Sequence, residues 1–209
     1  MRILPLVPVA AVALLVSCNG VRKPSNANFT AAINQYLAKH GEVCALVGRA
    51  FPVDVPRSAP NDPSAIGSKM AALAQAGLVS ETDTTAVVYG MLDALRGSPP
   101  PQLVRRYQLT ADGQKSFMQI PDAIGPMGGF CYGQKTVDRI VSWTQPETGS
   151  SQAEVTYTYK IANLAGWAER PDVQQAFPDL RAIVTRASKA NQIVGVQLTD
   201  AGWTVPGSR

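Results

Sequence analysis

Histidine, cysteine and charged side chains are all scarce in this chain of 209 residues. It holds one His and three Cys, and 16% of its residues are charged. So few His and Cys side chains exclude a zinc cluster. The net charge of +4 is small and does not indicate a nucleic-acid-binding protein. Hydrophobic residues make up 45% of the chain, which is enough for a core and excludes disorder throughout.

The motifs of common enzyme classes are missing as well. No serine lies in a Gly-x-Ser-x-Gly pattern or has Lys three residues later, and there is no phosphate loop or dinucleotide fingerprint. His40 falls at the end of a predicted helix, where a cation suits the helix dipole, so we interpret it as structural. The acidic residues leave one enzymatic alternative, an envelope hydrolase, for which Asp122 and Asp138 are arbitrary candidates. No cofactor is expected.

The N-terminus carries the most specific pattern. Arg2 is the only charge before an apolar run, Ile3–Val16, that is shorter than the roughly 20 residues of a membrane-spanning helix. Pro5 and Pro8 also disfavour a spanning helix. A short positive start followed by such a run is typical of a secretory signal peptide.

The end of this run, Leu15-Val16-Ser17-Cys18, resembles the lipobox of bacterial lipoproteins. The resemblance implies a signal peptide over residues 1–17, cleavage before Cys18, and two or three acyl chains on that residue, which make a stable membrane anchor. In Gram-negative lipoproteins an Asp after the Cys retains the protein at the inner membrane. Asn19 stands there, so the resemblance implies the periplasmic face of the outer membrane. An ordinary signal peptide with a chance Cys is the alternative.

Residues 18–28 are polar and are expected to form a tether between the lipid and the folded part. With Cys18 lipidated, Cys44 and Cys131 remain. Two thiols in an oxidising compartment usually pair, so we predict a Cys44–Cys131 disulfide. Such a bond would close a long loop, and on the chain-entropy model it would stabilise the fold by about 4 kcal/mol. The alternative is two free thiols, and the lack of Cys-x-x-Cys spacing disfavours a redox role.

Two helices are predicted in the first half. Apolar residues at spacings of three and four indicate a helix from Asn28 or Thr30, as its cap, to about His40. A second helix is predicted over 65–76, with Ser64 as its cap and Gly77 after it. The proline-rich segment Ala50–Pro63 is predicted to be a loop.

Residues 64–117 bear a local resemblance to the winged helix-turn-helix domain. The pattern runs through Leu73, Gly77, Leu78 and Val79 to Tyr107, Leu109, Thr110, Gly113 and Phe117. The resemblance implies a helical unit followed by a hairpin wing. DNA is still disfavoured as a partner, because the predicted location is far from the chromosome and Arg105 and Arg106 are the segment's only adjacent basic pair.

The second half is predicted to be an antiparallel sheet. Residues 153–161 alternate strictly between apolar and polar, which indicates a strand with one dry and one wet face. Further strands are expected over about 135–144 and 191–199, with a turn-rich linker, Pro121–Gly129, before them and a helix over about 181–189. Trp203 and Val205 are expected to start one more short strand.

Aromatic residues gather in this half. They could line a concave binding surface or fill the core, and the core interpretation is the stronger one. For a binding surface the candidates are Trp167, Trp203, Tyr157 and Tyr159.

Taken together, the patterns predict an α+β fold. A helical, winged-helix-like unit at 29–120 is followed by an antiparallel sheet unit at 130–209 packed on it. The expected function is that of a lipid-anchored periplasmic domain that binds or scaffolds an envelope protein or peptidoglycan, without catalysis and without nucleic acid.

Overall fold

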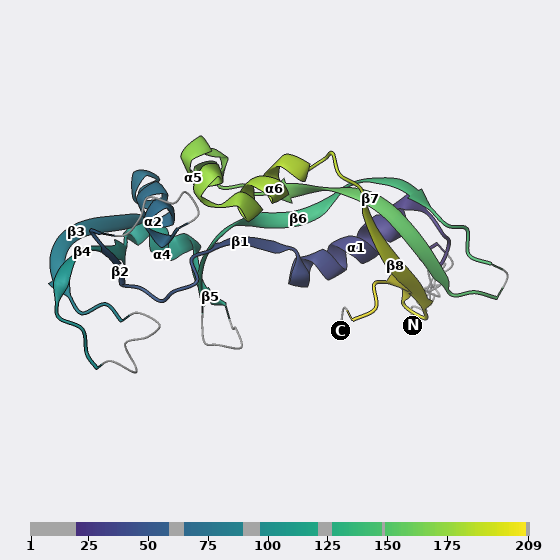
Figure 1. Cartoon of the computed structure of the whole chain (residues 1–209). Helices are drawn as coiled ribbons and strands as arrows, with labels where there is room; N and C mark the ends of the chain where they lie inside the picture. The colour runs from purple at the N-terminus through teal and green to yellow at the C-terminus, as the bar shows by residue number, and fades with distance from the viewer. Residues whose placement is uncertain (1–19, 59–64, 90–96, 121–126, 148, 208–209) are drawn as a thin grey trace, which may run out of the picture.

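The computed structural model describes residues 20–58, 65–89, 97–120, 127–147 and 149–207. These residues form a long arch with a small sheet at one end and a larger, curled sheet at the other (Figure 1). The fold is sheet-rich and mixes helices with antiparallel strands, as the predicted α+β class requires.

The larger sheet is built on one long strand, β6 (Met127–Trp143). Its main path is β1 (Glu42–Leu46), β6, β7 (Gln152–Ala162), β8 (Gln192–Thr199) and β9 (Gly202–Thr204), and β5 (Phe117–Ile120) also pairs with β6. The smaller sheet has the order β2 (Val53–Pro56), β4 (Gln102–Leu109), β3 (Val79–Ala86). All described pairings are antiparallel.

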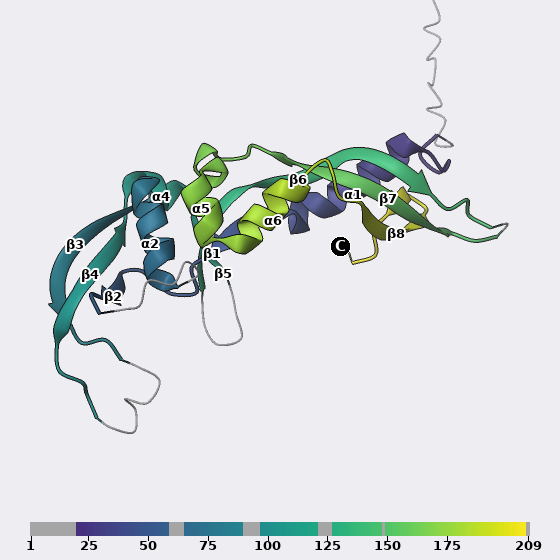
Figure 2. The same ribbon diagram turned by 45° about the horizontal axis from the view of Figure 1, so that its top comes forward.

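Each sheet has its own long helix. The helices are α1 (Asn26–His40), α2 (Ile66–Gln75), α4 (Ala111–Ser116), the 3-10 turn η1 (Gly166–Glu169), α5 (Pro171–Ala176) and α6 (Pro178–Arg186). Helix α1 lies under the curl of the larger sheet and α2 lies on the smaller sheet, while α5 and α6 cover the middle of the arch (Figure 2).

The first helix begins earlier than predicted. Its N-cap is Ser25, whose hydroxyl accepts from the backbone N–H of Asn28, so neither Asn28 nor Thr30 is the cap. It ends at His40 as expected, and Gly41 N–H closes the last turn on the Leu37 carbonyl. Helix α2 is confirmed within one residue at each end, and Ser64, its predicted cap, lies outside the described residues.

Two hydrophobic clusters fill the interior. The first joins the small sheet and α2 to β1, α5, α6 and the start of β6. The second lies between α1 and the strands β6–β9, with Phe29 and Ile33 fully buried at its centre. The predicted division at 29–120 and 130–209 stays a prediction. In space, α1 and β1 pack and pair with the later strands.

A winged-helix unit is not shown. Among the described residues, α2 alone lies between β2 and β3, and α1, the other long helix of the first half, packs on the large sheet. The residues of the motif nevertheless meet at one turn. The Thr110 hydroxyl donates to the Gly77 carbonyl at 2.7 Å and accepts from Gly113 N–H at 2.9 Å. A Cβ at Gly113 would lie 1.8 Å from the Leu78 carbonyl oxygen, so glycine is required there.

The Cys44–Cys131 disulfide is confirmed. The two cysteines are directly opposed on the neighbouring strands β1 and β6, beside a bulge after Val43. The bond therefore ties the early part of the chain to the strand on which the whole larger sheet is built.

Two strands were not predicted. Strand β2 lies within the segment expected to be a loop, because its short Val53/Val55 alternation is hidden among prolines. Strand β5 lies just before the expected linker, and β6 begins inside that linker at Met127. Both strands exist because long-range partners, β4 and β6, supply their hydrogen bonds.

Candidate functional site

The aromatic side chains considered for binding belong to the core. Tyr159 is 3% exposed, Trp203 7% and Tyr157 9%, and all three pack in the cluster around α1. Trp167 packs against the other cluster, with its ring near those of Tyr132 and Phe130. The structure therefore does not bring the four rings together, and it favours the core interpretation over the binding surface.

His40 and Asp138, the two residues considered for chemistry that the structure describes, have different partners. His40 stacks on Tyr36 at the end of α1, with ring centroids 4.5 Å apart. Asp138 accepts a hydrogen bond from Thr158, and Asp122 lies outside the described residues.

In the part of the chain that the structure describes, three carboxyl groups have a lowered pKa. Each is held down first by a hydrogen bond from a basic neighbour. The pairs are Asp54 with Arg106, Asp112 with Lys115 and Asp172 with Arg170. A general acid needs the opposite shift.

One grouping of metal-binding residue types occurs in the described part of the chain, at Glu42, Cys44 and Cys131. Both sulfur atoms of this group are held in the disulfide, so they are not thiolate ligands.

The N-terminal segment is held against the large sheet. Cys18 and the lipobox lie outside the described residues. From Gly20 on, the expected tether is folded: the Trp203 indole donates to the Arg22 carbonyl at 3.1 Å, and the Arg22 guanidinium donates to the Thr199 carbonyl at 3.2 Å. Gly202 has a φ of +113°, and a Cβ there would lie 3.3 Å from the Val21 carbonyl oxygen.

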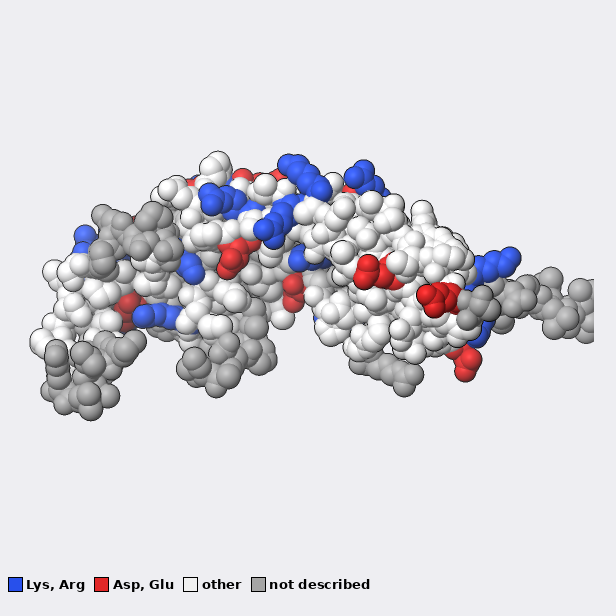
Figure 3. Space-filling view, turned by 45° about the vertical axis from the view of Figure 1, so that its right-hand side comes forward, with Lys and Arg blue, Asp and Glu red and all other residues white. Residues whose placement is uncertain are grey.

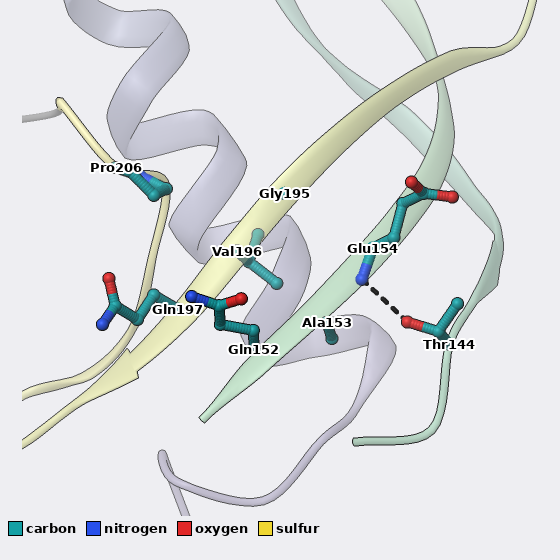
Figure 4. Close-up of a pocket in the computed structure, with 8 residues that line it drawn as sticks. All are labelled: Thr144, Gln152, Ala153, Glu154, Gly195, Val196, Gln197 and Pro206. Atoms are coloured by element: carbon teal, nitrogen blue, oxygen red, sulfur yellow. Dashed lines mark hydrogen bonds between the residues drawn. The ribbon is translucent and has the colours of Figure 1, made fainter. Parts of the chain in front are cut away.

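A hollow of about 370 Å³ lies near this end, over β7 and β8 (Figure 4). Gln152 and Gln197 face each other across the two strands, and Glu154 N–H donates to the Thr144 hydroxyl at 2.8 Å. The floor is formed by strands that pair with each other, so their backbone groups are already used in the sheet. The hollow offers amide side chains but no paired titratable groups.

The other end of the arch presents an open strand edge. Strand β3 pairs with β4 along all eight of its residues without a register shift, and no described strand pairs with its outer side. Its residues are mostly exposed after Val79. A free, regular edge of this length is a template for another strand.

The hydrogen-bond alternation shows which backbone groups are free. Thr110 N–H donates to the Leu78 carbonyl, so every second residue from Leu78 onward faces β4. Arg57 N–H donates to the Leu103 carbonyl, so the backbone groups of Leu103 point toward β2. Leu103 is therefore not hydrogen-bonded to Thr85, the residue opposite it on β3. Both observations agree on the outward set, whose N–H and C=O groups point away from the sheet: Val79, Glu81, Asp83 and Thr85.

A groove runs beside this edge. It has a volume of about 420 Å³ and lies between α2 and β3, lined by Ala71, Ala74, Gln75, Val79, Ser80, Glu81 and Arg105. On the helix side the two alanines have small side chains and leave the groove open, and Val79 gives it an apolar floor. Glu81 and Arg105 form its polar rim.

Charges line the same face of the small sheet. Arg105 lies 3.6 Å from a Glu81 oxygen and 3.7 Å from an Asp83 oxygen, and Arg57 pairs with Asp83. The pKa of Arg105 is raised, mainly by its hydrogen bond with Tyr107 and then by Glu81. Burial raises the pKa of Tyr107. Glu81 and Asp83, which stand on the edge strand itself, are about half exposed.

Exposed apolar residues add to this end of the molecule. Leu103 is 68% exposed and Tyr89 67%, the two highest values among the large hydrophobic residues that the structure describes. Leu103 stands opposite Thr85, on the side of the sheet that carries the groove.

The sequence carried little signal for this edge. Strand β3 reads VSETDTTA, in which only the ends are apolar, so it lacks the alternation that identified β7. The one available signal was its β-branched threonines, which favour strands.

No helix in the residues that the structure describes is long and apolar enough to cross a membrane. Compared with family models, curated proteins and solved structures, the chain has no match.

Proposed function

We propose that this chain is a lipid-anchored protein of the bacterial cell envelope, on the periplasmic face of the outer membrane, that binds a protein partner and does not catalyse a reaction. The anchor is Cys18, acylated after removal of residues 1–17. The lipobox-like Leu15-Val16-Ser17-Cys18 and Asn19 support this part of the proposal.

The observation that carries the proposal is that the two ends of the arch differ. The segment that follows Cys18 is held at the β8–β9 end by Arg22 and Trp203. The open edge of β3 lies at the opposite end (Figure 1). A chain anchored at one end and open at the other can present its free strand to a partner away from the membrane.

A protein partner fits the surface better than nucleic acid. Arg105 and Arg106 are each paired with carboxylates, Arg106 through two hydrogen bonds of 2.8 Å to Asp54, so neither presents a free charge to phosphates. On the face drawn in Figure 3, acidic side chains lie among the basic ones. A nucleic-acid surface needs a stripe of one sign.

Fractionation with metabolic acyl labelling tests the anchor. The full chain, made in a Gram-negative host fed an alkyne fatty acid, is expected to carry the label and to sediment with the outer membrane. Cys18→Ala should lose the label and leave the membrane. Asn19→Asp is the matched control and should keep the label but move to the inner membrane. Unlabelled, soluble wild-type protein would contradict the proposal.

A further inference from the structure

The open edge of β3 and the groove beside it are parts of one surface. The outward backbone groups of Val79 and Glu81 border the groove, and the side chains of both residues line it. A strand laid along β3 would therefore gain main-chain hydrogen bonds and insert alternate side chains between β3 and α2. Peptide recognition by strand addition has these two components, bonds for affinity and pockets for specificity.

We propose that β3 binds an extended peptide segment of the partner by strand addition, with one apolar side chain in the α2–β3 groove and cationic side chains beside Glu81 and Asp83. This deepens the partner binding of the proposed function and rests on it. The segment has an apolar residue next to Val79 and Lys or Arg two and four positions further along the strand.

The apolar position follows from the groove. Ala71 and Ala74 present only methyl groups toward the space, and Val79 is 3% exposed at its floor. A volume of about 420 Å³ accommodates a branched aliphatic side chain together with the peptide backbone that carries it. Larger residues at either alanine would remove this space.

The cationic positions follow from the edge. Residues directly opposite each other on neighbouring strands contact through their side chains, and opposite charges there are favourable. Glu81 and Asp83 have Arg105 on their inner side, at 3.6 Å and 3.7 Å, and Asp83 also pairs with Arg57. No described strand lies on their outer side, where about half of each acidic side chain is exposed. A peptide strand would place its own side chains on that outer side.

The same charges disfavour a second copy of this chain as the occupant. An antiparallel pair of two β3 strands would oppose the Glu81 and Asp83 of one copy to those of the other. Like charges directly opposite each other destabilise a strand pair.

The experiment uses the full chain in detergent and a fluorescein-labelled synthetic peptide. The peptide has a sequence that favours an extended conformation: valine, then lysine two and four positions later, with serine or threonine between them. Its reverse sequence tests the other strand direction. A scrambled peptide that places the lysines at adjacent positions is the control. Fluorescence polarisation measures binding, and hydrogen exchange measures the amides of residues 79–85.

Glu81→Pro separates the backbone contribution from the charge. Proline removes an outward N–H but no bond to β4, and edge strands tolerate it at such positions. Its matched control, Glu81→Ala, loses the same carboxylate and keeps the N–H. We expect binding to weaken about threefold in Glu81→Ala and at least tenfold in Glu81→Pro. In both variants the inward amides of Ser80 and Thr82 should stay protected, which shows that the strand is still folded.

Ala74→Leu tests the groove without changing the backbone of β3. Leucine favours the helix and fills the space, so peptide binding should fall about tenfold. The control Ala74→Ser keeps the groove open and should bind nearly as the wild type does.

Equal binding to wild type and Glu81→Pro would overturn the proposal, and so would an absence of binding by both peptide directions. A dimer in sedimentation that Glu81→Pro dissolves would assign the edge to a second copy and overturn the peptide occupant. These results leave the anchor untouched, because acylation of Cys18 is measured separately. Protection of the Asp83 amide by the peptide in the wild type, lost in Glu81→Pro, would support strand addition.

Discussion

The long strand β6 and the edge strand β3 differ in how their outer backbone groups are satisfied. Beyond Gln134, where the pairing with β1 stops, β6 is covered by α1: Val137 N–H donates to the Asn34 side chain at 2.8 Å. The side-chain amide of Gln134 also donates to the Leu37 carbonyl. Nearby, Lys135 N–H donates to the Gly41 carbonyl at 2.7 Å. Strand β3 has no such cover from the residues that the structure describes.

The difference separates a structural region from an interacting one. The large sheet encloses α1 and the aromatic cluster around Phe29, and its strands carry bulges that strengthen the curl. The small sheet is regular, carries its charges on exposed strands and leaves the outer edge of β3 without a described strand. Charged residues such as Glu81 and Asp83 are one means by which proteins protect an edge from unspecific pairing, and the groove beside β3 favours a selective binding role.

The largest expected effect compares the two interiors. Phe29 and Leu73 are both fully buried, but Phe29 packs edge-on against Trp143 and Trp203 with ring centroids 5.3 Å and 5.0 Å away. Phe29→Ala should lower the free energy of unfolding by about 4 kcal/mol and Leu73→Ala by about 3 kcal/mol. Urea denaturation measures both. Phe29→Ala should also shift the emission of Trp143 and Trp203, and an unchanged tryptophan emission in this variant would contradict the assignment of the rings.

An intermediate effect tests the covered edge. Asn34→Leu leaves the Val137 N–H without its acceptor, so we expect a loss of about 2 kcal/mol in the free energy of unfolding. Asn34→Asp keeps an acceptor oxygen in place and should lose much less. The Val137 amide should exchange faster with solvent in the leucine variant only. Equal losses in both variants would show that the edge does not depend on this bond.

The smallest effect concerns the charges of the small sheet. The two hydrogen bonds from Arg106 hold the pKa of Asp54 below its ordinary value of 3.8. The charged form of Asp54 is thus favoured in the folded state. Its contribution to stability is fully present above the ordinary pKa and is lost as the pH falls through the lowered pKa. The melting temperature of the wild type should fall over this acid range, and that of Asp54→Asn should fall less. Thermal denaturation at a series of pH values measures both. Identical acid profiles would contradict the pairing.

Some features were predictable because they depend on neighbours in the sequence. The alternation along β7 and the spacing of apolar residues in α1 and α2 follow from the geometry of a strand and a helix. The disulfide followed from counting the thiols that remained after Cys18. The winged-helix pattern was predictable only as a turn: Thr110, Gly77 and Gly113 do meet, but the unit around them is not shown.

Other features needed the whole chain. The start of β6 could not be predicted, because Gly128 and Gly129 suggest a turn until β5 and β1 pair with them. The tether could not be recognised as folded, because its partners Trp203 and Thr199 are at the other end of the chain. The candidate site was missed for the same reason, since β3 is polar throughout its middle and its edge exists only in relation to β4 and α2.

The sequence by itself therefore determined the local elements, the cysteine pair and the lipobox-like N-terminus, all of which depend on residue type and short spacing. Tertiary structure decided which aromatic rings are buried, which strand edge α1 covers and which edge stays open. An edge is a property of a strand's neighbours in space, and those neighbours are brought together only when the chain folds.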